Sequence, residues 1–162
     1  MTLVTPELLV TPKLFEEVLS SRKNLVALET SNAQVAVAQL RPLAMRSGQS
    51  VYLWQPEAGI VSLRESEVRV PGTHRLGDAF RYVLRSIHFG VYVFAGFDTP
   101  MKAQDTLLLR SISRISGGNE RKIVLVGAKL VLPDDLEGLF EHLYCGLGRQ
   151  RHLRLRDGKW VI

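Results

Sequence analysis

Two kinds of hydrophobic pattern alternate along the chain. Short and nearly continuous apolar runs are typical of strands that are buried on both faces. Apolar residues spaced three or four apart are typical of amphipathic helices. The strand-like runs lie at 24–29, 51–54, 91–95 and 122–126. The helix-like spacings lie at 12–19, 31–46, 76–87, 101–115 and 134–143. Strands that alternate with helices of this length predict βαβ units and a mainly parallel sheet.

Helix-capping residues and prolines set the expected helix ends. Thr11 before Pro12 predicts a hydroxyl N-cap followed by proline at the first helical position, and 99–100 repeats this pattern. Pro42 lies inside the segment 31–46, where the missing N–H should kink or shorten the helix. The expected C-terminal stops are Gly48, Gly90 and the pair at 117–118.

Two segments depart from the alternation. Residues 60–70 predict an edge hairpin or an irregular excursion that ends at the turn signal 71–72. Two alternating runs on either side of Asp157–Gly158 predict a C-terminal β-hairpin with a type I′ turn, which would add antiparallel edge strands. We therefore expect a three-layer α/β sandwich with a mainly parallel central sheet, in one domain over 1–162. This is a Rossmann-like or P-loop-like fold.

The composition is that of a globular protein. Hydrophobic residues make up 46% and charged residues 23% of the 162 positions. We expect no membrane segment, because no apolar run approaches the roughly 20 residues that span a bilayer. The N-terminus lacks signal-peptide features and there is a single cysteine, Cys145, so a cytoplasmic location is expected.

The net charge of +5 is carried almost entirely by the C-terminal hairpin. Residues 149–162 hold five basic residues and one acid, so the rest of the chain has an excess of one positive charge. Arg149, Arg151, Arg154 and Arg156 could bind phosphates of a nucleotide, a cyclic dinucleotide or a nucleic acid. The same arginines could instead protect an exposed edge strand from pairing with other chains.

A phosphate-binding loop is missing where the strand and helix pattern calls for one. Strand 24–29 continues through Glu29, Thr30, Ser31 and Asn32 into the next helix with no glycine at the junction. A phosphate loop needs glycines there, because the backbone must approach the phosphates and point its N–H groups inward. We find neither a Walker motif nor a dinucleotide fingerprint, and expect no cofactor.

Ligands of open α/β sheets bind beyond the carboxyl ends of the strands. At these ends the chain places polar, charged or aromatic side chains that could contact a ligand: Glu29, Thr30, Ser31, Trp54, Gln55, Asp98, Thr99 and Lys129. Thr30 or Ser31, and Thr99, are more simply explained as helix caps, and Glu29 and Asp98 could serve only to complement helix N-termini. No convergent nucleophile and base is evident, so we expect no enzyme. His142 and Cys145 make no closed metal site, so no metal is expected.

The order of elements resembles the N-terminal domain of AAA ATPases from cyanobacteria, chloroplast genomes and other bacteria. The resemblance covers roughly 5–140 and rests on four stretches: 23–30, 51–59, 91–98 and 122–137. It implies a degenerate relative of the ATPase fold that lacks its own phosphate loop and is followed by an active module in the family. No such module follows here, so we expect a stand-alone, non-catalytic regulatory or interaction domain.

The expected partner is an ATPase or another multi-protein complex. A homo-oligomer is a second expectation, and nucleic acid is less favoured because the positive charge is confined to one hairpin.

Overall fold

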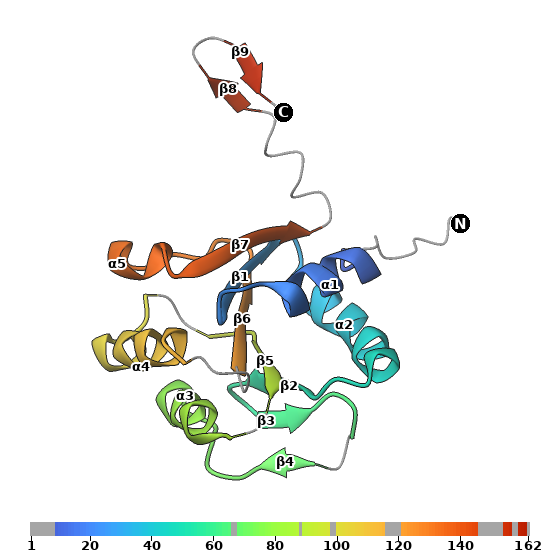
Figure 1. Cartoon of the computed structure of the whole chain (residues 1–162), viewed down its shortest axis with the longest axis vertical. Coiled ribbons are helices and arrows are strands. Elements are labelled where there is room, and N and C mark those ends of the chain that lie inside the picture. The colour runs from blue at the N-terminus through green and yellow to red at the C-terminus, as the bar shows by residue number, and fades with distance from the viewer. Residues whose placement is uncertain are drawn as a thin grey trace.

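The fold is centred on one mixed β-sheet with helices on both faces (Figure 1). The computed structural model describes residues 9–65, 68–87, 89–97, 100–115, 121–145, 154–156 and 159–161. Seven strands of the described chain form the sheet, in the order β4-β3-β2-β5-β6-β1-β7. The parallel strands are β1 Leu25–Thr30, β2 Val51–Gln55, β5 Gly90–Phe94, β6 Arg121–Gly127 and β7 Phe140–Cys145. Two antiparallel strands, β3 Gly59–Ser62 and β4 Arg69–Val70, complete one edge.

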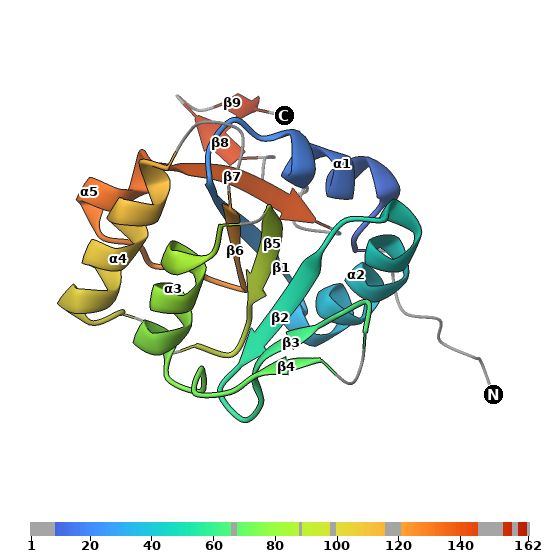
Figure 2. The same cartoon turned by 60° about the horizontal axis from the view of Figure 1, so that its bottom comes forward.

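The helices divide between the two faces of the sheet. They are α1 Pro12–Ser20, α2 Ala33–Ser47, α3 Leu76–Arg85, α4 Ala103–Ser113 and α5 Asp134–Glu137. Helices α1 and α2 cover one face, and α3, α4 and α5 cover the other (Figure 2). This arrangement confirms the predicted three-layer α/β sandwich. Among the described residues, no helix has the length and apolar character that crossing a membrane requires.

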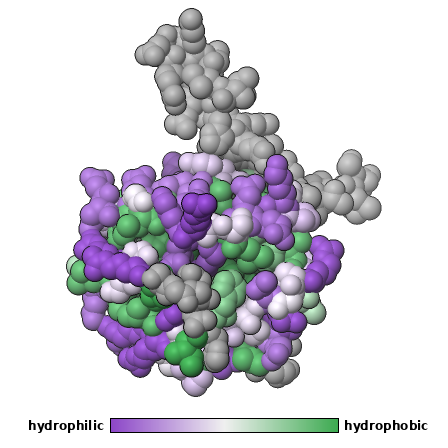
Figure 3. All heavy atoms as spheres, viewed as in Figure 1, coloured by the Kyte–Doolittle hydropathy of each residue, from purple (hydrophilic) through white to green (hydrophobic). Residues whose placement is uncertain are grey.

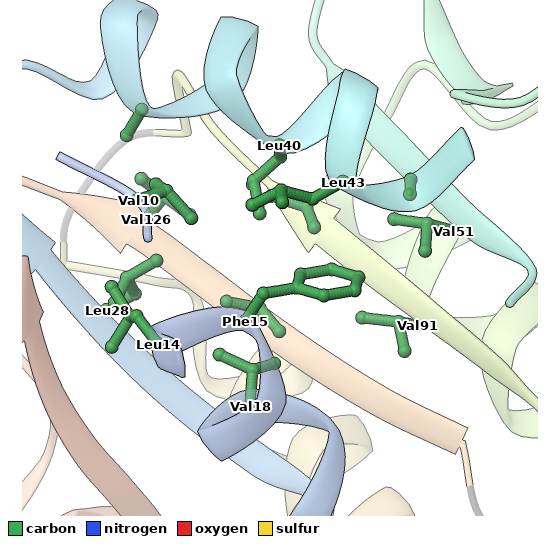
Figure 4. Packing of buried hydrophobic residues seen from close by; sticks show 14 of the residues in the cluster. Val10, Leu14, Phe15, Val18, Leu28, Leu40, Leu43, Val51, Val91 and Val126 are labelled. Carbon is green, nitrogen blue, oxygen red and sulfur yellow. The ribbon is translucent and has the colours of Figure 1, made fainter. Parts of the chain in front are cut away.

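The core consists of two apolar layers separated by the sheet. On one face, Phe15 and Val18 of α1 and Leu40 of α2 pack above the strands (Figure 4). On the other face, Phe80 of α3 lies against Phe94 of β5. Central strands supply both layers, because successive side chains point to opposite faces. The continuous apolar runs of the sequence are therefore buried strands.

The sequence prediction was wrong for residues 138–143. The expected helix over 134–143 ends at Glu137, and the chain continues as β7 from Phe140. Strand β7 pairs in parallel with β1 over its whole length, from Phe140 beside Leu25 to Cys145 beside Thr30. Phe140 and Leu143 then belong to opposite core layers, which fits strand alternation and excludes one shared helical face.

Two helix boundaries also differ from the expectation, and so does the effect of Pro42. Helix α4 begins at Ala103, not at Pro100, and α3 ends at Arg85, so that Gly90 is the first residue of β5 and not a helix stop. Ile87, expected on the apolar face of α3, is 70% exposed. Pro42 does not shorten α2, which runs through it to the left-handed C-cap Gly48.

The predicted C-terminal hairpin is confirmed, but the prediction that it adds edge strands to the main sheet is not. Strands β8 Arg154–Arg156 and β9 Lys159–Val161 pair in antiparallel fashion, and in the described residues they form a separate two-stranded sheet. The turn residues Asp157 and Gly158 lie outside the described part of the chain. The antiparallel strands of the main sheet come from residues 59–62 and 69–70, where an edge hairpin was expected.

The buried Tyr92 and the partly buried Tyr52 predict a loss of stability at high pH. Burial raises the pKa of Tyr92 to about 12 and also raises that of Tyr52, whose ring stacks on Tyr92 at 4.9 Å. The native state therefore keeps protons that the unfolded chain loses above its ordinary pKa near 10. The stabilisation is complete below pH 10 and declines toward pH 12. In thermal unfolding, we expect Tyr92→Phe to show a smaller fall in Tm between pH 9 and 11 than the wild type. An equal fall in both proteins would contradict this assignment.

Candidate functional site

The junction after β1 is closed by side-chain caps instead of a phosphate loop. Asn32 is the N-cap of α2, and its Oδ1 accepts a hydrogen bond from the backbone N–H of Val35 at 3.2 Å. Thr30 is fully buried, and its Oγ1 accepts the N–H of Asn32 at 3.2 Å. The expectation that Thr30 or Ser31 caps the helix was wrong by one or two residues. Thr30 instead holds the cap residue in place.

Other predicted residues lie near the same end of the sheet. Glu29 pairs with Gly127 across β1 and β6, and its backbone oxygen accepts the thiol of Cys145 at 3.5 Å. Lys129 is exposed just beyond β6. Glu29, Thr30, Ser31 and Lys129 therefore stay predictions. Asp98 and Thr99 lie outside the described residues.

A pocket of about 710 Å³ lies at the carboxyl ends of β2 and β5, between the first turns of α3 and α4. We call it the α3–α4 pocket. Its polar lining includes Arg75, Asp78, Arg81, Lys102 and Asp105, and its apolar lining includes Trp54, Leu76, Phe97 and Met101. Of these residues, only Trp54 was predicted from the sequence, because it lies at the carboxyl end of a strand. The helix-start residues were missed because arginine and lysine carry no capping signature.

Both helix N-termini at the pocket lack a side-chain cap. The N-cap residues are Arg75 for α3 and Lys102 for α4, and neither makes a capping hydrogen bond. The first intrahelical bonds run from Ala79 N to Arg75 O and from Thr106 N to Lys102 O, at 3.0 and 3.1 Å. Earlier N–H groups of each helix therefore have no intrahelical acceptor. The positive ends of two helix dipoles face the same pocket.

The acidic residues of the pocket differ in their partners. Asp78 pairs with Arg81 at 3.0 Å on the surface of α3. Asp105 is only 7% exposed, and within the described chain the structure gives it neither a hydrogen bond nor an ion pair. A Cβ added to Gly77 would lie 3.0 Å from Asp105 Oδ1, so the carboxylate of α4 reaches the first turn of α3.

The wall of the pocket at β2 is fixed by buried hydrogen bonds. Trp54 Nε1 donates to the backbone oxygen of Thr73 at 2.6 Å. The hydroxyl of Thr73 accepts the N–H of Ile60 at 2.9 Å and donates to the oxygen of Val70 at 2.7 Å. Trp54 therefore keeps its position without help from a ligand.

No group of three potential metal ligands occurs among the described residues. His142 is exposed, with Nε2 3.1 Å from the oxygen of Glu137, whereas Cys145 is buried. Arg149 and Arg151 lie outside the described residues, and for Arg154 and Arg156 only the backbone in β8 is described.

Comparison with known families gives one match over most of the fold. Residues 11–144 match the family described as the SpoVK-like AAA ATPase, N-terminal domain. The match runs from the N-cap of α1 to the penultimate residue of β7. No curated protein matches the sequence.

Proposed function

Because the chain belongs to the family of SpoVK-like AAA ATPase N-terminal domains, we propose that it is a non-catalytic interaction or regulatory module. Its partner in this proposal is an ATPase or another multi-protein complex in the cytoplasm. The observation that carries the proposal is the closed junction between β1 and α2, where Asn32 occupies the helix N-terminus.

A phosphate would have to compete with protein groups at this junction. The side chain of Asn32 already accepts the Val35 N–H that a phosphate oxygen would need, and Thr30 Oγ1 accepts the N–H of Asn32. No glycine lets the backbone approach a phosphate closely at residues 29–33. The fold is retained without this chemistry, which supports action through a surface.

The exposed surface fits a contact that forms and dissociates. Its large hydrophobic residues in the described chain are spread over several elements: Met45, Val68, Tyr82, Ile87, Leu107 and Val131. Figure 3 shows one face, on which hydrophobic residues are interspersed among hydrophilic ones. An obligate interface would be larger and more continuously apolar. A second copy of the chain is an alternative partner under the same proposal.

Affinity purification from the native host tests the proposal. We expect reproducible recovery of an ATPase or of several subunits of one complex, and retention of that partner after nuclease treatment. The variants Leu107→Asp, on α4, and Met45→Asp, on α2, place the same new charge on helices that cover opposite faces of the sheet. Loss of the partner with one variant and not the other locates the contact.

Recovery of the bait alone would contradict the proposal. Recovery of partners that disappear after nuclease treatment would favour the alternative, an anion-binding hairpin. The observation behind that alternative is strand β8, in which Arg154 and Arg156 are two residues apart. Two positive charges this close in the sequence could act together on one phosphate backbone.

A further inference from the structure

The α3–α4 pocket combines features that favour an anionic group at one end. Two helices of 10 and 11 residues present their first turns to it, and neither first turn is capped by a side chain. Free N–H groups at a helix N-terminus together with the helix dipole form a binding site for phosphate or carboxylate. Arg75 and Lys102 stand at the two N-cap positions and add positive charge.

Asp105 adds a carboxylate to the lining of the same pocket. Asp105 is 7% exposed, and among the described residues it has neither a hydrogen bond nor an ion pair. No fully buried side-chain oxygen in the described residues lacks a hydrogen-bond partner, so the carboxylate of Asp105, which has none, keeps contact with solvent in the pocket. A ligand that carries an N–H or O–H group would provide the missing donor. Gly77 leaves this carboxylate uncovered, since any side chain there would press on Oδ1.

The rest of the pocket is suited to an apolar ligand body. Trp54, Leu76, Phe97 and Met101 contribute to the lining. The volume of about 710 Å³ falls within the range of roughly 300–1,000 Å³ that is typical of small-molecule sites. Trp54 is held by its bond to Thr73, so this wall is preformed.

We propose that the α3–α4 pocket binds a small organic anion. Its phosphate or carboxylate lies at the first turns of α3 and α4, its apolar body lies toward Trp54, and an N–H or O–H group donates to Asp105. This site is separate from the closed β1–α2 junction and from the C-terminal hairpin. It would act whether or not the protein also binds an ATPase.

Fluorescence of Trp54 can report binding. The chain has two tryptophans, so Trp160→Phe leaves Trp54 as the only one. The probes are adenosine 5′-monophosphate, which offers a phosphate, and L-phenylalanine, which offers a carboxylate; both also carry an apolar ring and N–H donors. We expect a saturable change with at least one probe below ~10 mM, together with an NMR shift of the Gly77 amide. The probe that binds more tightly identifies the anionic group.

Two variants and one control test the site itself. Lys102→Ala and Asp105→Asn should each weaken the probe by about tenfold, since each removes one charge that the proposal assigns to the ligand. Arg46→Ala removes an exposed charge from the last turn of α2, on the other face, and should bind as the parent does. Circular dichroism verifies that each variant is folded. Absence of binding by both probes up to ~10 mM, or equal binding by all variants, would overturn the proposal.

Discussion

Replacing Phe80 with alanine should lower the free energy of unfolding by about 3–5 kcal/mol, the cost of truncating a fully buried phenylalanine. Phe80 has no exposed surface, and its ring centroid lies 4.9 Å from that of Phe94 in the centre of the sheet. The substitution would leave a cavity between α3 and β5 that the strand cannot fill. Urea unfolding, monitored by far-UV circular dichroism, measures the effect.

Leu107→Ala is the matched control for Phe80→Ala. Leu107 is a large apolar residue of the neighbouring helix α4, but 57% of it is exposed. Its truncation should change stability by no more than about 0.5 kcal/mol, as is usual for surface positions. If the two variants lost similar stability, the packing of α3 on the sheet would not be as the structure shows.

Replacing Gly59 with alanine should cost about 2–5 kcal/mol, from the left-handed backbone together with a forced shift of its neighbour. Gly59 has a φ of +72°, and a Cβ there would lie 2.7 Å from Thr73 Oγ1. Thr73 would have to move, which disturbs its hydrogen bonds to Ile60 and Val70 and the support of Trp54. The midpoint of urea unfolding should therefore fall, and Trp54 fluorescence should change in the native state.

Gly72→Ala separates the cost of the left-handed backbone from the cost of moving Thr73. Gly72 has nearly the same φ, +73°, but nothing lies within 4 Å of an added Cβ. The Gly72→Ala variant should therefore lose only the stability that the left-handed backbone costs, about 1–2 kcal/mol. Equal losses for Gly59→Ala and Gly72→Ala would show that the shift of Thr73 costs no stability and would contradict this assignment.

The helix N-termini at the carboxyl ends of the strands differ in how well they could receive an anion. At the end of β1, Asn32 caps α2, and its side chain accepts the N–H of Val35. At the ends of β2 and β5, the first turns of α3 and α4 are uncapped and carry Arg75 and Lys102. A ligand site in this fold is therefore better placed at the α3–α4 pocket than after the first strand.

The sequence by itself determined the class of fold and most of its elements. Continuous apolar runs mark β1, β2, β5 and β6, because strands buried on both faces need hydrophobic residues at every position. The N-cap Thr11 and the C-cap Gly48 also followed from local chemistry, since both depend only on their own backbone and nearest neighbours. The resemblance to the AAA ATPase N-terminal domain was confirmed over 11–144.

Only the tertiary structure decided features that depend on residues far apart in the chain. Residues 140–145 have an ambiguous pattern, and pairing with β1 makes them a strand. Asn24 donates to the backbone oxygens of Ile112 and Ile115, so the end of α4 is bound from the start of β1. The pocket likewise needs Gly77 and Asp105 to meet across two helices. Such contacts depend on packing between distant segments, which local hydrophobic periodicity does not encode.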